Sequence, residues 1–186
     1  MTPEELHHSF PDNIPLPDLL VRLCAFTDED GGDGGTISAD LELYERGPSA
    51  LDAWFHGDAP AASQFIVFAS DGTGALYGYW RYDGQLLDRA PLVYLNDEGA
   101  HNTVLASTLE QFLILVGVGQ KYVGMVDVWD EHEAPDSYTL RYRDWLRTEL
   151  GVEPPTLDEA RAIVERARGQ HPDLDAWVEQ SLVAAQ

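Results

Sequence analysis

Residues 64–119 read QFIVFASDGTGALYGYWRYDGQLLDRAPLVYLNDEGAHNTVLASTLEQFLILVGVG, and this stretch decides the fold. Short runs rich in β-branched and aromatic residues alternate with turn signals, of which Asp71-Gly72 and Asp83-Gly84 are the clearest. Asp-Gly pairs between apolar runs are typical of antiparallel strands joined by tight connections. We therefore expect a strand meander, with strands at 65–69, 75–82 and 92–95 and a brief one at 104–105.

An amphipathic helix is predicted to close this stretch. Leu109, Phe112, Leu113 and Val116 recur at the i, i+3, i+4, i+7 spacing of one helix face. Ser107, followed three residues later by a glutamate, fits a capping box at the helix start. Together the strands and the helix predict an α+β fold in a single domain, mainly an antiparallel strand meander packed with helices.

The flanking regions extend this domain on both sides. Proline-rich residues 1–13 are expected to form a flexible N-terminal arm, residues 14–136 the α+β domain, and residues 137–186 a helical extension packed on it. A capping box at Thr156 and Glu159 marks one of the helices in this extension. Further elements are predicted as a helix at 17–26, a strand at 37–44, helical turns at 48–55 and a strand at 122–129.

Charge is strongly unbalanced along the chain. The sequence has 33 acidic and 11 basic residues, for a net charge of −22, and residues 1–136 hold 24 of the acids but 5 of the bases. Such a field repels nucleic acid phosphates and speeds the encounter with a cationic protein. Solubility or adaptation to high salt is the alternative explanation, since net charge alone does not specify a partner.

Location and cofactor use follow from what the sequence contains. The longest clearly apolar run, residues 112–119, is far shorter than the roughly 20 residues that span a bilayer. The acidic N-terminus has no apolar signal region, and the single cysteine, Cys24, fits a reducing compartment. We expect a cytoplasmic protein that uses no cofactor and contacts neither membrane nor nucleic acid.

The order of these elements resembles the SUKH superfamily, which contains bacterial toxin-immunity proteins and a fungal regulator of cell-wall synthesis. Leu16-Pro17 opens the first helix, and the strand–glycine turn–strand segment 65–82 includes Asp71-Gly72-Thr73-Gly74. The resemblance covers about residues 14–118, and residues after 121 depart from a minimal member. The other matching segments are the glycine loop at 31–35, residues 91–96, and the helix STLEQFL at 107–113.

This resemblance implies a non-enzymatic domain that binds a protein, and in the immunity setting the partner is a toxin domain such as a nuclease. An acidic inhibitor can occupy the basic surface with which a nuclease holds phosphates. Aromatic residues on an exposed strand would add anchors for the partner, although alternating aromatics are also ordinary sheet packing. The candidate partner-binding residues are Asp71, Tyr77, Tyr79, Asp83, Asp97 and Glu98.

Catalytic and metal-binding patterns are weak in this sequence. Residues 28–35, DEDGGDGG, fail the EF-hand pattern because glycine stands at loop position 5 and aspartate at position 6. Asp130, Glu131, His132, Glu133 and Asp136 offer possible metal or acid–base groups, but clustered acids in a proline-bounded segment are usually a solvated loop. We therefore expect no metal site and no catalytic residue.

Two other functions stay open at this point. One is a regulatory or scaffolding module of the same fold that binds a host protein, and the other is a small hydrolase that uses the acids at 130–136 with a metal. The neighbouring gene distinguishes the first from an immunity protein, and metal analysis tests the second. The identity of the partner, the docking face and the oligomeric state are not specified by the sequence.

Overall fold

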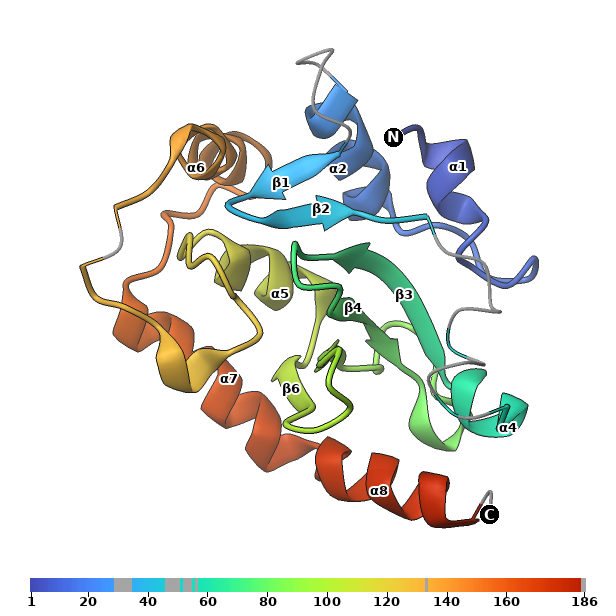
Figure 1. Cartoon of the computed structure of the whole chain (residues 1–186). Helices are drawn as coiled ribbons and strands as arrows, with labels where there is room; N and C mark the ends of the chain where they lie inside the picture. The colour runs from blue at the N-terminus through green and yellow to red at the C-terminus, as the bar shows by residue number, and fades with distance from the viewer. Residues whose placement is uncertain (29–34, 46–50, 52–54, 56, 133, 185–186) are drawn as a thin grey trace.

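The computed structural model describes residues 1–28, 35–45, 51, 55, 57–132 and 134–184. Within this part of the chain, six strands form one antiparallel sheet in which every strand pairs with the next in sequence (Figure 1). The predicted meander is confirmed. The strands are β1 (Thr36–Ser38), β2 (Leu41–Leu43), β3 (Phe65–Ser70), β4 (Leu76–Trp80), β5 (Leu92–Leu95) and β6 (Thr103–Ala106).

Helices pack around this sheet, and the last three follow one another at the C-terminal end of the chain. The α+β class and the helical C-terminal region are thus as predicted, in one domain. None of the described helices is long and apolar enough to cross a membrane. The described helices are α1 (Pro3–His7), α2 (Asp18–Asp28), α4 (Ala59–Ala62), α5 (Leu109–Val116), α6 (Ser137–Glu149), α7 (Leu157–Gln170) and α8 (Leu174–Ala184), with short 3₁₀ turns η1 (Tyr82–Gly84) and η2 (Val126–Val128).

Apolar cores cover both faces of the sheet, and the side chains of β3, β4 and β5 contribute to both of them. On β4, Tyr77 and Tyr79 belong to the core that contains α1, α2, α5 and α6. Leu76 and Trp80 belong to the opposite core, against α4 and α8. The side chains of β4 thus alternate between the two cores. Every residue of β3, β4 and β5 is buried, as expected for central strands.

Helix α7 spans the two cores beside the last strand. Its Ala160 and Val164 belong to the first core, while its Ala167 belongs to the second. Figure 1 shows α7 and α8 running in succession past β6. A helix beside an edge strand protects it from pairing with other chains. The C-terminal helices therefore complete the core and also set the surroundings of the β5–β6 turn.

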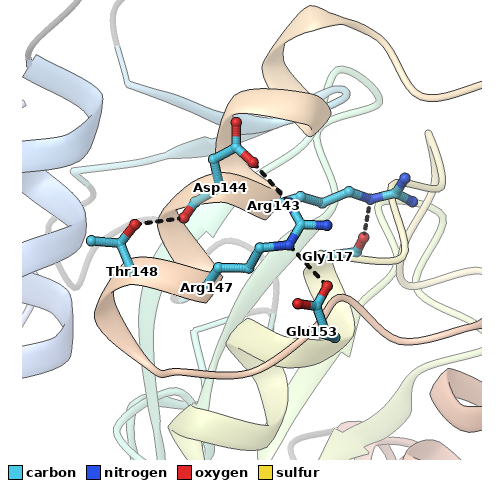
Figure 2. A network of polar contacts seen from close by, with 6 residues as sticks. All are labelled: Gly117, Arg143, Asp144, Arg147, Thr148 and Glu153. Carbon is cyan, nitrogen blue, oxygen red and sulfur yellow. Dashed lines mark hydrogen bonds and ion pairs between the residues drawn. The ribbon is translucent and has the colours of Figure 1, made fainter.

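Helix α6 is tied to the end of α5 by an arginine (Figure 2). The Arg143 guanidinium donates hydrogen bonds of 2.8 Å each to the carbonyls of Gly117 and Val118, just past the C-terminus of α5. A positive charge there also interacts favourably with the helix dipole. One turn further on, exposed Arg147 instead pairs with the carboxylates of Asp144 and Glu153.

The N-terminal segment differs from the flexible arm that the prolines suggested. Residues 3–7 form α1, which begins with a capping box between Thr2 and Glu5. Leu6 is fully buried and Phe10 nearly so, and both belong to the core below α2. Two apolar residues are too few to predict such docking, because their burial depends on a site supplied by distant parts of the chain.

Two local predictions are also corrected. Residues 37–44 form the β1–β2 hairpin rather than one strand, because the chain reverses at Ala39, whose φ is +49°. Helix α5 is capped by Thr108 instead of Ser107, and the Thr108 side chain accepts a hydrogen bond from the Gln111 amide. The predicted turns at 48–55 and the glycine loop at 31–35 lie largely outside the described residues.

Candidate functional site

Asp71 and Tyr77, two of the predicted partner-binding residues, lie in the interior. The Asp71 carboxylate accepts a 2.7 Å hydrogen bond from the Tyr77 hydroxyl and a 3.0 Å bond from the Thr73 amide. The Tyr77 hydroxyl in turn accepts a 3.2 Å hydrogen bond from the Gly124 amide. These bonds link the β3–β4 turn to the loop that contains Gly124. Asp71 and Tyr77 therefore stabilise the fold from within.

The expected exposure of Tyr77 and Tyr79 is therefore wrong. The two side chains are 0% and 2% exposed, respectively. Tyr79 packs against Phe68 and against Phe10 of the N-terminal segment. The alternation of side chains along a strand shows which residues share a face, but it does not show whether other elements cover that face. These tyrosines cannot serve as surface anchors in this structure.

Asp83, Asp97 and Glu98 are exposed, at opposite ends of the sheet. Asp83 lies in the connection that precedes β5, and the other two lie in the turn that follows β5. In an antiparallel meander, the β5–β6 turn lies at the same end as the β3–β4 turn. The structure thus groups Asp97 and Glu98 with Asp71 and separates Asp83 from them.

Beside the β5–β6 turn lies a closed loop at residues 120–130, where a strand was predicted. The Gln120 side chain joins the two ends, since its amide donates to the Asp130 carbonyl at 3.0 Å and its oxygen accepts from the Asp130 amide at 2.7 Å. Val123, Val126 and Trp129 are buried beneath the loop. Their spacing of three fits turns rather than strand alternation. Compact loops with paired ends are frequently functional.

The outer side of this loop carries Met125, Asp127 and Val128. Met125 and Val128 are 37% and 59% exposed, although Val123, Val126 and Trp129 of the same loop are buried. A cavity of about 220 Å³ separates them from the β5–β6 region. We call it the loop groove; it is lined by Tyr94, Asn96, His101, Thr103, Gly124, Met125, Val126, Asp127, Val128 and Arg168.

A second cavity, of about 360 Å³, continues the loop groove toward the start of α8. The two share His101, Thr103, Asp127 and Arg168, and the second adds Asp173 and Asp175 among its lining residues. Arg168 donates a 2.8 Å hydrogen bond to the Thr103 hydroxyl. The combined surface is thus formed by the β5–β6 turn, the 120–130 loop and the α7–α8 junction.

Asp175 positions the β5–β6 turn within this surface. Its carboxylate accepts hydrogen bonds from the backbone amides of His101 and Asn102, at 3.2 and 3.0 Å. It also accepts a 2.8 Å bond from the Asn102 side chain. His101 has a φ of +63°, a conformation that non-glycine residues rarely adopt. These contacts hold the turn in a conformation that it would otherwise disfavour.

The electrostatic field at this end of the sheet is negative. Burial is the main cause that raises the pKa of Tyr94 to about 12, and the carboxylates of Asp71, Asp97 and Glu98 raise it further. Three carboxylates line the two cavities, against one guanidinium, that of Arg168. The lining carboxylates belong to Asp127, Asp173 and Asp175.

The acidic segment at 130–136 is part of the local structure. The Asp130 carboxylate accepts a 2.8 Å hydrogen bond from the His132 amide, and Asp136 caps α6 by accepting from the Thr139 amide at 2.7 Å. Among the described residues, no three His, Cys, Asp or Glu side chains are grouped to hold a metal ion. Glu133 and residues 29–34 of the acidic glycine loop lie outside the described residues.

Cys24 is fully buried, and burial raises the pKa of its thiol to about 11, as expected for an inert core cysteine.

Sequence reasoning missed a chain of polar side chains at the α7–α8 junction. The Tyr82 hydroxyl lies 3.0 Å from His171 Nδ1, and His171 Nε2 lies 3.1 Å from the Ser107 hydroxyl. A serine beside a histidine resembles a nucleophile–base pair. Ser107, however, donates to the side-chain amide oxygen of Gln170 at 2.8 Å, and neither Ser107 nor His171 lines the cavities described above. These hydrogen bonds link the α7–α8 junction to the residues that flank β4 and β6.

No protein-family model, curated protein or solved structure matches this chain. Its function is therefore inferred from the geometry and charge of its own surface. The loop groove with its continuation toward α8 combines a loop closed by hydrogen bonds, exposed apolar side chains and a negative field.

Proposed function

We propose that this chain is a cytoplasmic, non-enzymatic binding protein that neutralises a toxin domain by protein–protein contact. The observation that carries this proposal is the loop groove, where exposed Met125 and Val128 adjoin the carboxylate of Asp127 on a rigid loop. Apolar anchors within a charged surround are what protein interfaces use for affinity and orientation. The sequence resemblance of residues 14–118 to the SUKH superfamily supports the immunity role.

The charge of the chain supports a cationic partner. A net charge of −22 creates a field that attracts basic surfaces, and nuclease toxins need such surfaces to hold phosphates. An acidic protein that covers the basic surface prevents substrate binding without any chemistry of its own. Neutralisation by occlusion therefore requires no catalytic residue in the inhibitor.

The direct test uses the gene adjacent to the one that encodes this chain. Its product, if it contains a toxin domain, is expressed with and without this chain, and survival and co-purification are measured. We expect protection together with a stable complex. If the chain shows no binding and gives no protection, the immunity proposal is overturned. Binding to a non-toxic host protein would favour a regulatory module.

The salt dependence of association tests the electrostatic part of the proposal. If the acidic field steers the encounter, the association rate falls steeply between low and physiological salt, because added ions screen exposed charges. The dissociation rate changes less. A salt-independent association rate would mean that the charge serves solubility only.

A further inference from the structure

We propose that the loop groove is the docking surface, and that it takes an extended, cationic segment of the partner in which an apolar residue lies between arginines or lysines. This inference rests on the proposed function and specifies the surface and the ligand chemistry. The three walls of the groove come from elements that hydrogen bonds tie to other parts of the chain.

Hydrogen bonds hold the loop in one arrangement in the free chain. Gln120 closes its ends with two hydrogen bonds, and the Gly124 amide is bound to the buried Tyr77 hydroxyl. On the opposite wall, Asp175 fixes the β5–β6 turn. A preorganised surface loses little conformational entropy on binding, which raises affinity.

The apolar contribution comes from Met125 and Val128. Both are exposed on one side of the groove, while neighbouring Val126 is buried and supports them. Methionine side chains adapt to irregular apolar partners because they are unbranched and flexible. An apolar side chain of the bound segment is expected to pack here.

The carboxylates in and around the groove favour a cationic occupant. Asp127 lines both cavities and, within the described part of the chain, has no hydrogen bond or ion pair. Asp97 and Glu98 lie close enough to affect Tyr94 in the same groove. The single guanidinium, that of Arg168, already donates to Thr103. A ligand arginine or lysine would therefore find carboxylates available.

The groove and the second cavity together form one divided channel. The groove itself has a volume of about 220 Å³. The second cavity, of about 360 Å³, continues it in one direction. Successive side chains of an extended segment fit such a divided channel.

A peptide probe tests this surface without any knowledge of the partner. Amide spectra of the ¹⁵N-labelled protein are recorded with the capped peptide Gly-Arg-Leu-Arg-Gly and with its charge-reversed counterpart Gly-Glu-Leu-Glu-Gly. We expect only the cationic peptide to shift the amides of His101, Met125, Asp127 and Val128. Shifts that cluster instead at the separate apolar pocket formed by residues 13–18 and 86–87, or no shifts, would overturn the inference.

Matched variants complete the experiment. Asp127→Asn is expected to weaken the peptide about fivefold, whereas Asp88→Asn, which removes the same charge from another exposed loop, leaves the affinity unchanged. Val128→Ser should weaken it as well, with exposed Val183→Ser as its control. Equal weakening by both members of either pair would overturn the inference.

The experiments distinguish a wrong docking surface from a wrong proposed function. If the peptide maps to the groove but no toxin is neutralised, the proposed function is wrong and the docking surface stands. If a toxin is neutralised with equal affinity by wild type, Asp127→Asn and Val128→Ser, the docking surface is wrong and the proposed function stands.

Discussion

The Tyr77 hydroxyl and the Asp71 carboxylate form a 2.7 Å hydrogen bond inside the first core, beneath the 120–130 loop. Burial first, and then the neighbouring Asp71 charge, raise the pKa of Tyr77, so the hydroxyl keeps the proton that it donates. The same oxygen accepts from the Gly124 amide. One side chain therefore links the β3–β4 turn, strand β4 and the candidate binding loop.

Tyr77→Phe should destabilise the protein by about 1–3 kcal/mol, because it leaves a buried carboxylate oxygen and the Gly124 amide without their shared partner. Urea denaturation followed by circular dichroism measures this change. Hydrogen exchange of the Gly124 amide should accelerate in parallel.

Tyr79→Phe is the matched control for this prediction. Tyr79 is equally buried on the same face of β4, yet its hydroxyl has no hydrogen bond among the described residues. We expect a clearly smaller loss of stability. If the two variants lose the same stability, the Asp71–Tyr77–Gly124 connection contributes nothing beyond packing.

Local patterns predicted the central meander because each strand there is long enough to show its own periodicity. The Asp-Gly turns and the apolar runs of residues 65–95 depend on neighbours in sequence, and so does the 3.6-residue spacing of α5. Residues 122–129 were mistaken for a strand because valines favour strands locally. Their actual conformation is set by contacts with Tyr77 and Tyr94, which are remote in sequence.

The candidate groove was not predictable for a related reason. Its walls come from residues 94–103, 124–128 and 168–175, which only the folded chain brings together. Asp97 and Glu98 were chosen as exposed turn residues, and their exposure is confirmed. Tyr77 and Tyr79 were chosen as exposed aromatics, but tertiary packing covers them, Tyr79 by Phe10 and Tyr77 by Phe112.

Gly124→Ala should destabilise the loop. An added methyl group at this position would overlap the Tyr94 ring, so either the ring or the loop backbone must shift. Such overpacking costs about 1–3 kcal/mol. Thermal unfolding measures the loss, and amide spectra should show changes confined to the groove.

Gly169→Ala, in contrast to Gly124→Ala, should increase the stability of the protein. This glycine lies in α7 with open space around its Cα, so alanine fits without a clash. Alanine in a helix is favoured over glycine by about 1 kcal/mol, and we expect a more stable protein. A destabilised Gly169→Ala variant would contradict the described packing of α7.

Arg143→Ala should be more harmful than Arg147→Ala, although the two arginines are one helical turn apart (Figure 2). Arg143 is half-buried and satisfies two backbone carbonyls at the end of α5, and hydrogen bonds from charged groups contribute about 1.5–3 kcal/mol each. Arg147 makes exposed ion pairs, which contribute little. Urea denaturation of the two variants measures the difference, and equal losses would contradict the capping role of Arg143.

His171 should make the stability of the protein depend on pH near neutrality. Partial burial lowers the pKa of its imidazole below the ordinary value of 6.5. The unfolded chain therefore binds a proton more readily than the folded chain. It follows that the free energy of unfolding decreases as the pH falls from about 6.5 through the lower pKa of the folded state.

The same histidine bridges Tyr82 and Ser107, and its protonation leaves neither ring nitrogen able to accept a hydrogen bond. A protonated ring can no longer accept from the Tyr82 hydroxyl. His171→Gln should remove this part of the pH dependence, measured by denaturation at pH values between about 5.5 and 7.5. An NMR titration of the His171 ring gives the pKa directly, and a value at or above 6.5 would contradict the effect of burial that the prediction depends on.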